Sequence, residues 1–167
     1  MTRLLIVMRH AKSDWDSGAT SDFDRPLARR GERDAPRMGR WLREQRYIPQ
    51  HIVSSPAARA RETTIRVVKE LGLQQAAVDW NRALYEADVE DLLEVIANCD
   101  APTTLLIGHN PGLEALVRYL ARPATLPPEP KVMPTAGVIV LELPEKARRA
   151  PRQQSRVVAH MRPRWLD

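Results

Sequence analysis

Arginine and histidine side chains stand at three points of the sequence where a short apolar run gives way to a polar segment. Arg9 and His10 follow the first of these runs, Arg59 lies in the segment after the second, and His109 comes shortly after a later one. Two guanidinium groups and two imidazoles suit a dianionic phosphoryl group, because arginine offers planar, paired donors to its oxygens. These residue types therefore favour a site that binds a phosphoryl group.

The elements that must position these side chains follow from the alternation of apolar runs with segments of helical period. This alternation predicts an α/β fold, a three-layer sandwich whose mostly parallel central sheet is flanked by helices. The expected strands are 3–8, 52–53, 77–80 and 104–107, with two closing strands at 138–143 and 156–161. The carboxyl ends of parallel strands meet at one edge of a sheet, where open α/β sheets bind their ligands. We therefore expect the three junctions to converge.

Helix starts are expected directly after two of these junctions. Ser55-Pro56 and Asn110-Pro111 each have the pattern of an N-cap followed by proline in the first helical position. Asp88 has the pattern of a cap for another helix, and a long helix is expected over 29–46. This arrangement would place Arg59 within, and His109 beside, the first turn of a helix, where the helix dipole and free N–H groups favour an anion.

Length and charge limit the choice of function. The 167 residues are predicted to form one domain, residues 1–167. The net charge is +5, and all of this excess lies in residues 144–167, while residues 1–143 are balanced. We interpret this basic segment as a loop and edge strand whose charge keeps them soluble, or as a docking surface for an acidic protein partner. No aromatic platform suited to bases is present, so a nucleic-acid partner is not expected.

Other compositional features bear on compartment and cofactors. Cys99 is the single cysteine, which excludes an internal disulfide framework and a cysteine metal cluster. The apolar run at the start is too short for a signal peptide, and no window approaches a membrane span of about 20 apolar residues. We expect a cytoplasmic protein with no membrane partner, no cofactor and no metal.

Taken together, the motifs resemble the histidine phosphatase (phosphoglycerate mutase-like) superfamily. Arg9-His10 after an opening strand, Ser55-Pro56 followed by Arg59, and Gly108-His109 carry this resemblance. Within the superfamily the chain resembles SixA-type phosphohistidine phosphatases, by the segments 9–13, 24–27, 54–56, 84–87 and 108–112 and by Gly31. The resemblance covers roughly residues 4–163.

The resemblance implies a role for each of four residues. His10 would be the nucleophile, and Arg9, Arg59 and His109 would bind the phosphoryl group. The physical chemistry agrees, because nearby guanidinium groups would lower the pKa of His10 below about 6.5 and keep its imidazole unprotonated. The same charges would stabilise the transferring phosphoryl group. The reaction is expected to pass through a covalent phospho-His10 intermediate and to require no cofactor.

The proton donor for the leaving group is less defined. Glu86 is the best candidate, and a surface position for it is an equal alternative. Phosphohistidine can leave as a neutral imidazole, so a weak acid site would favour phosphohistidine on a protein partner as substrate. A phosphomonoesterase or mutase acting on a small phosphorylated metabolite is the alternative within enzymes. A catalytically silent phosphate-binding or protein-docking module is the alternative from another class.

Overall fold

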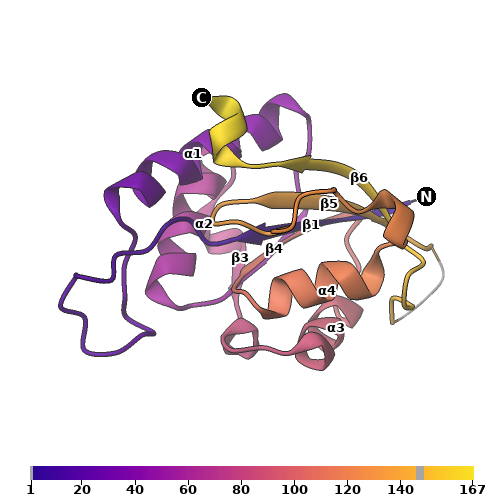
Figure 1. Cartoon of the computed structure of the whole chain (residues 1–167), viewed down its shortest axis with the longest axis horizontal. Coiled ribbons are helices and arrows are strands. Elements are labelled where there is room, and N and C mark those ends of the chain that lie inside the picture. The colour runs from indigo at the N-terminus through magenta and orange to yellow at the C-terminus, as the bar shows by residue number, and fades with distance from the viewer. Residues whose placement is uncertain (1, 146–148) are drawn as a thin grey trace.

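The computed structural model describes residues 2–145 and 149–167 and shows a six-stranded sheet between two layers of helices (Figure 1). The strands are β1 (Arg3–Arg9), β2 (His51–Ser54), β3 (Val78–Trp80), β4 (Thr103–Gly108), β5 (Val138–Leu143) and β6 (Arg156–Met161). The α-helices are α1 (Arg29–Glu44), α2 (Ala58–Glu70), α3 (Val89–Ala97) and α4 (Gly112–Leu120). This confirms the expected α/β sandwich.

The strand order is β3-β2-β4-β1-β5-β6. The pairs β3–β2, β2–β4 and β4–β1 are parallel, whereas β1–β5 and β5–β6 are antiparallel. The sheet is therefore mostly parallel, and the two closing strands form the antiparallel pair that the sequence predicts. In the register of the sheet Arg9 pairs with Gly108 and Ser54 pairs with Ile107, so β1, β2 and β4 end at the same edge.

The strands of the parallel part have apolar residues on both faces because helices cover both sides. In β1, Leu5 and Val7 belong to the core beneath α3 and α4, whereas Ile6 and Met8 belong to the core beneath α1 and α2. Figure 1 shows these two helix pairs on opposite sides of the sheet. A continuous apolar run is thus what a strand between two helix layers requires.

Two of the predicted helix starts differ from the structure. Helix α2 begins at Ala58 rather than at Pro56, and the Ser55 hydroxyl accepts a hydrogen bond from the Ala57 N–H without capping the helix. Helix α4 begins at Gly112, two residues after Asn110. In both cases the dipeptide with proline belongs to the connection between strand and helix. The Asn110 side chain nevertheless accepts a hydrogen bond from the Glu114 N–H in the first turn of α4 at 3.2 Å, as the sequence predicts for a capping residue.

The Asp88 cap is confirmed. Its carboxylate accepts a hydrogen bond from the Asp91 N–H at 2.9 Å, and the Asp91 carboxylate accepts from the Asp88 N–H at 3.1 Å. This reciprocal capping box fixes the start of α3. Within the described residues, none of the helices is both long and apolar enough to cross a membrane.

The basic segment 144–167 divides into two parts in the structure. Arg149 forms an ion pair with Glu90, and Arg156 lies 3.3 Å from Glu142. Arg162 and Arg164 instead lie at the far end of β6, beyond Met161. Two of the seven basic residues of this segment, Lys146 and Arg148, lie outside the described residues.

Candidate active site

His10 lies at the centre of the sheet edge, directly after β1. Its N–H donates to the Gly108 carbonyl at the end of β4, at 3.1 Å, and its carbonyl accepts from the Ala136 N–H at 3.0 Å. The residue is only 5% exposed. Backbone contacts on both sides of β1 therefore hold the imidazole in place before any ligand binds.

A hydrogen bond determines which ring nitrogen of His10 is available. Nδ1 lies 2.7 Å from the Ala11 carbonyl oxygen, which can only accept, so Nδ1 carries the proton. In the neutral ring the lone pair is then on Nε2. Ala11 is itself anchored, because its N–H donates to the Thr63 hydroxyl at 3.0 Å, and that hydroxyl donates to the Arg59 carbonyl at 2.7 Å.

Burial keeps the His10 ring neutral. The pKa of His10 is lowered to about 3, chiefly by burial and to a smaller extent by the nearby His109, Arg59 and Arg9 side chains, while the hydrogen bond to Ala11 acts in the opposite sense. The direction agrees with the prediction from the sequence. The main cause differs, since loss of solvation outweighs the guanidinium charges. Sequence patterns do not report burial of one side chain, which depends on packing.

His109 lies beside His10, with 5.2 Å between the ring centroids. Its Nε2 is 2.7 Å from the Ser55 hydroxyl, and its Nδ1 is buried with no hydrogen-bond partner among the described residues. When the Ser55 hydroxyl donates to Nε2, Nδ1 carries the proton and is free to donate to a ligand. Burial, followed by the charge of Arg59, lowers the pKa of His109 to about 4.

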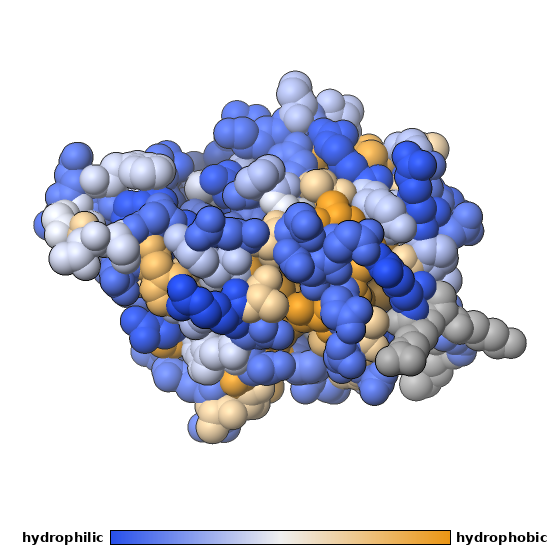
Figure 2. Space-filling model, turned by 90° about the horizontal axis from the view of Figure 1, so that it is seen from below, coloured by the Kyte–Doolittle hydropathy of each residue, from blue (hydrophilic) through white to orange (hydrophobic). Residues whose placement is uncertain are grey.

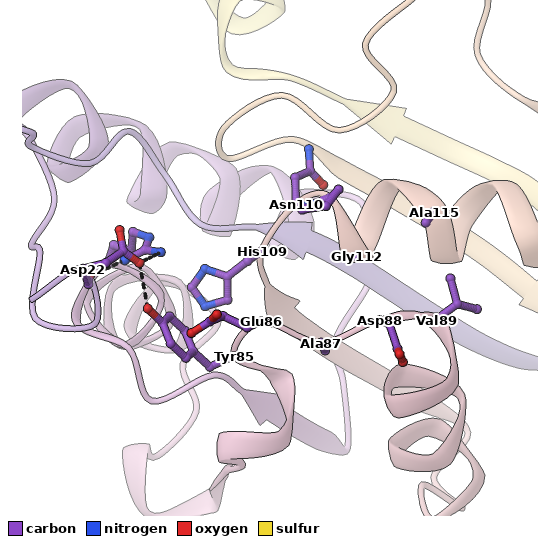
Figure 3. Close-up of a pocket in the computed structure, with 12 residues that line it drawn as sticks. Asp22, Tyr85, Glu86, Ala87, Asp88, Val89, His109, Asn110, Gly112 and Ala115 are labelled. Atoms are coloured by element: carbon purple, nitrogen blue, oxygen red, sulfur yellow. Dashed lines mark hydrogen bonds and ion pairs between the residues drawn. The ribbon is translucent and has the colours of Figure 1, made fainter.

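Arg59, in the first turn of α2, is 6% exposed and is held by a loop residue that the sequence did not identify. It donates to the Asp22 carbonyl oxygen at 2.7 Å and to the Asp22 carboxylate at 2.9 Å. Tyr85 donates its hydroxyl to the same carboxylate at 2.7 Å (Figure 3), and Arg25 donates to its other oxygen at 3.1 Å. These hydrogen bonds, that of Tyr85 most strongly, hold the pKa of Asp22 well below its usual range.

Arg9 approaches the site from the end of β1. Its Nη1 donates to the Met133 carbonyl oxygen at 3.3 Å, and its buried Nε has no partner among the described residues. The Asn110 side chain donates to the same carbonyl at 2.8 Å. The loop before β5 thus connects the two strand ends, since Arg9 follows β1 and Asn110 follows β4.

A pocket of about 740 Å³ opens between the start of α3 and the start of α4, and Arg59, His109 and Glu86 are among the residues that line it. Figure 3 shows the Glu86 carboxylate beside Tyr85 and near the His109 ring. Arg9 and His10 are not part of this lining. Figure 2 shows this side of the molecule as largely hydrophilic, with hydrophobic residues visible between the polar ones near its middle.

Backbone geometry holds Glu86 at the pocket. Its φ is +56°, an uncommon value for a residue other than glycine, and such strain is concentrated at functional sites. The following residue, Ala87, packs so closely on α4 that a Cβ at Gly112 would collide with its carbonyl oxygen. Glu86 is exposed, and its carboxylate has no hydrogen-bond partner among the described residues.

Three residues of this arrangement were not expected in the site. Ser55 was predicted to cap a helix, and no role was predicted for Tyr85 or Asp22. The proximity of Ser55 to the strand end was the one available indication. Among the described residues, no group of three or more histidine, cysteine, aspartate or glutamate side chains could hold a metal ion.

The relatives found by comparison with known proteins include some of undefined function. A chloroplastic protein of Arabidopsis thaliana is 34% identical over 131 residues, which is 72% of this chain and 60% of that protein, so the chain spans less than two thirds of its length. A protein of Mycobacterium leprae is 32% identical over 166 residues, covering 94% of this chain and 100% of its own. Other relatives match about half of this chain. One is a 2,3-bisphosphoglycerate-dependent phosphoglycerate mutase of Methylobacterium radiotolerans, which is 35% identical over 94 residues, and this match covers 55% of this chain and 44% of the mutase.

Solved structures resemble the chain over nearly its whole length. The protein histidine phosphatase SixA, in complex with tungstate, is 25% identical with a TM-score of 0.81 and coverage of 98% of this chain and 99% of its own. A candidate phosphohistidine phosphatase SixA of Agrobacterium tumefaciens is 28% identical with a TM-score of 0.77, covering 98% and 100%. The family model for the histidine phosphatase superfamily (branch 1) matches residues 5–94. The chain belongs to this superfamily and is a phosphatase.

Proposed function

We propose that the chain removes the phosphoryl group from phosphohistidine on a protein partner, with His10 as the nucleophile. One observation carries the proposal: the Nδ1–H of the buried His10 ring donates to the Ala11 carbonyl, which leaves the Nε2 lone pair free in a ring that stays neutral at pH 7. An imidazolium would have no lone pair with which to attack phosphorus.

The proposed reaction has two displacements. In the first, the Nε2 lone pair of His10 forms a bond to phosphorus as the bond to the substrate imidazole nitrogen breaks, and that electron pair returns to the leaving ring. In the second, a water oxygen bonds to phosphorus, the bond to His10 breaks, and inorganic phosphate leaves. The electron pair of the N–P bond returns to His10 Nε2, and the product leaves as H2PO4−, which keeps both water protons or releases one to solvent.

The donors around His10 would bind the phosphoryl oxygens. The guanidinium groups of Arg59 and Arg9 are cationic donors, and His109 has a buried Nδ1 without a hydrogen-bond partner among the described residues. Preorganised donors of this kind are worth more in a site that excludes water, because they need no reorganisation as charge develops. The site can therefore stabilise the extra negative charge of the transferring group.

The acid groups of the pocket bear on the substrate. The Asp22 carboxylate is held as an anion by Tyr85, Arg59 and Arg25, so it is a poor proton donor. Glu86 lines the pocket without a hydrogen-bond partner among the described residues and is the better candidate. An alcohol leaving group depends on such an acid, whereas phosphohistidine leaves as neutral imidazole when its other ring nitrogen is protonated. Asp88 also lines the pocket, but its carboxylate is engaged in the capping box of α3. One exposed acid without a hydrogen-bond partner among the described residues favours the second kind of substrate.

The first test is His10→Ala. We expect kcat/KM to fall at least about a thousandfold, because the nucleophile is lost and only binding and electrostatic effects remain. Turnover of a phosphohistidine peptide, p-nitrophenyl phosphate and phosphoglycerates is measured side by side for both proteins. Wild-type protein quenched during turnover should carry an acid-labile phosphoryl group on His10. An active His10→Ala variant would disprove the nucleophile, and faster turnover of a phosphoglycerate than of phosphohistidine would favour the mutase or phosphomonoesterase alternative.

Glu86→Gln tests the substrate class through the leaving group. We expect kcat/KM for β-glycerophosphate, an alkyl ester, to fall at least about tenfold, while that for a phosphohistidine peptide falls less than about threefold. Glu94→Gln removes an exposed carboxylate from α3 away from the pocket and is the matched control. Equal losses for both substrates would show that Glu86 acts in a step common to both.

A further inference from the structure

A second cluster of cations lies outside the catalytic pocket, in a separate hollow of about 440 Å³. The hollow is bounded by the start of α1, the loop before β5 and the turn after β6. Its cations are Arg30, Arg33, Lys131, Arg162 and Arg164. We call this feature the basic hollow. It contains part of the basic C-terminal segment that the proposed reaction does not use.

Two carboxylates, Asp34 and Asp167, also line the basic hollow, and both are engaged on its α1 side. The buried Asp34 lies 3.3 Å from Arg33 and 4.0 Å from Arg30. Asp167 lies 2.8 Å from Arg37 and 3.7 Å from Arg33. These ion pairs offset part of the charge of α1 and leave the opposite side of the hollow without compensation.

The other three cations have no ion pair among the described residues. Lys131 and Arg164 are exposed, whereas Arg162 is only 8% exposed. Arg162 donates to the Lys131 carbonyl oxygen at 3.0 Å and stacks 4.9 Å from the centre of the Trp165 ring, and its buried Nε has no partner. A guanidinium held in this way without a carboxylate retains a cost of desolvation that an anion from outside would offset.

The basic hollow faces the same edge of the sheet as the catalytic pocket. Val138, the first residue of β5, pairs with Met8 near the end of β1 and with Met161 at the end of β6. The loop before β5 separates the two sites: Thr135 lines the hollow, and the next residue, Ala136, donates to the His10 carbonyl. Figure 1 shows the turn after β6, in yellow, beside α1.

We propose that the basic hollow docks an acidic segment of the protein whose phosphohistidine enters the catalytic pocket. This inference rests on the proposed function and extends it to the surface chemistry of the partner. The loop before β5 stands between the two sites, so a small metabolite in the pocket would not occupy the hollow, whereas a protein surface spans both. Opposite charges across such a contact accelerate association and select the partner.

The first test measures binding of a fluorescein-labelled peptide of eight glutamates by fluorescence anisotropy. The variant Lys131→Glu/Arg164→Glu changes two exposed residues of the hollow, and we expect it to weaken binding about tenfold. Arg46→Glu/Lys69→Glu is the control with the same change in total charge. Arg46 follows α1 and Lys69 lies in the last turn of α2, both exposed and at the ends of their helices remote from the hollow. We expect the control to bind within about threefold of wild type.

The outcomes of the binding test are distinct. Equal weakening in both variants would show that net charge alone attracts the peptide and would overturn the proposal. Unchanged binding in the hollow variant would overturn it as well. Double-stranded DNA and phosphatidylserine vesicles are tested in the same way. If either binds more tightly than the peptide and this binding is lost in the hollow variant, the hollow is assigned to nucleic acid or to a membrane instead.

Turnover separates docking from the reaction. For a phosphohistidine peptide with a glutamate-rich flank, the hollow variant should lose about tenfold in kcat/KM through KM, and the difference from wild type should shrink as salt rises. The same peptide with an uncharged, serine-rich flank, and p-nitrophenyl phosphate, should change less than about twofold. Hydrolysis of p-nitrophenyl phosphate but of neither peptide would disprove the phosphohistidine substrate, whereas peptide turnover unaffected by the hollow variant would disprove docking.

Discussion

Two groups of cations occupy one edge of the sheet, and they differ in burial and in counter-charge. In the site around His10, Arg59 is nearly enclosed and already bonded to the Asp22 carboxylate, and burial keeps the His10 ring neutral. In the basic hollow, Lys131 and Arg164 are exposed and have no carboxylate partner among the described residues.

The contrast shows how similar residue types serve different purposes. A buried guanidinium has a fixed position and acts strongly on one neighbouring anion, because little water screens it. An exposed cation is mobile and screened within about 10 Å at 0.1 M salt, so it contributes to association more than to chemistry. Changes to the cations around His10 should therefore alter the reaction with every substrate, and changes to the cations of the hollow only the reaction with acidic protein substrates.

The largest effect should come from Arg59→Lys. We expect kcat/KM for p-nitrophenyl phosphate to fall about a hundredfold, because one ammonium group cannot replace the planar donors that serve Asp22 and the phosphoryl group together. Arg30→Lys, at an exposed position of the hollow, is the control and should change this rate less than about twofold. If kcat/KM of Arg59→Lys falls less than fivefold, Arg59 acts only as a point charge. The two groups of cations would then not differ in the way described.

An intermediate effect is expected on stability as pH falls. The folded pKa values of His10 and His109, about 3 and about 4, lie below the value of about 6.5 expected when unfolded. Between these values the unfolded chain binds more protons than the folded one, so the free energy of unfolding falls as pH falls below about 6.5. For two such groups, the free energy of unfolding should fall by roughly 2 kcal/mol between pH 6 and pH 5.

Urea unfolding at pH 7, 6 and 5 measures this dependence. The double variant His10→Asn/His109→Asn should flatten it, whatever its own stability at pH 7. Asp22 contributes in a lower range, because its lowered pKa stabilises the folded state above about pH 3.8 and that contribution is lost as pH falls further. If the free energy of unfolding of the double variant depends on pH as steeply as that of the wild type, His10 and His109 are not the source of the pH dependence.

The smallest effect should come from Asp22→Asn, which makes the pocket more like the hollow by removing a counter-charge. We expect inorganic phosphate to inhibit p-nitrophenyl phosphate hydrolysis about threefold more strongly, because the Asp22 carboxylate no longer competes for Arg59 or repels the anion. Asp16→Asn, at an exposed position of the same loop, is the control. Weaker inhibition by phosphate would instead show that Asp22 chiefly holds Arg59 in its binding position.

Much of the site was predictable because its central residues lie next to buried strands. The apolar run of β1 indicates where a strand ends, and His10 follows that end directly. The same reasoning places His109 after β4. The residues that the sequence did not reveal are held by contacts between distant segments: Asp22 meets Tyr85 across 63 positions and Arg59 across 37.

The helix starts show the same limit at shorter range. Ser55-Pro56 has the local pattern of a cap, but the Ser55 hydroxyl lies 2.7 Å from His109, and α2 begins only at Ala58. A tertiary partner 54 residues away outweighs the local preference. The pattern identified the right residue and assigned it the wrong partner.

The sequence by itself determined the α/β architecture, the strand ends that carry Arg9, His10 and His109, and the phosphoryl chemistry, because apolar periodicity and residue type are local properties. Only the tertiary structure decided that burial lowers the pKa of His10, that Asp22 holds Arg59, and that residues from the loop before β5 and the turn after β6 enclose the basic hollow. These features depend on strand order and on packing between segments far apart in the chain, which no local pattern encodes.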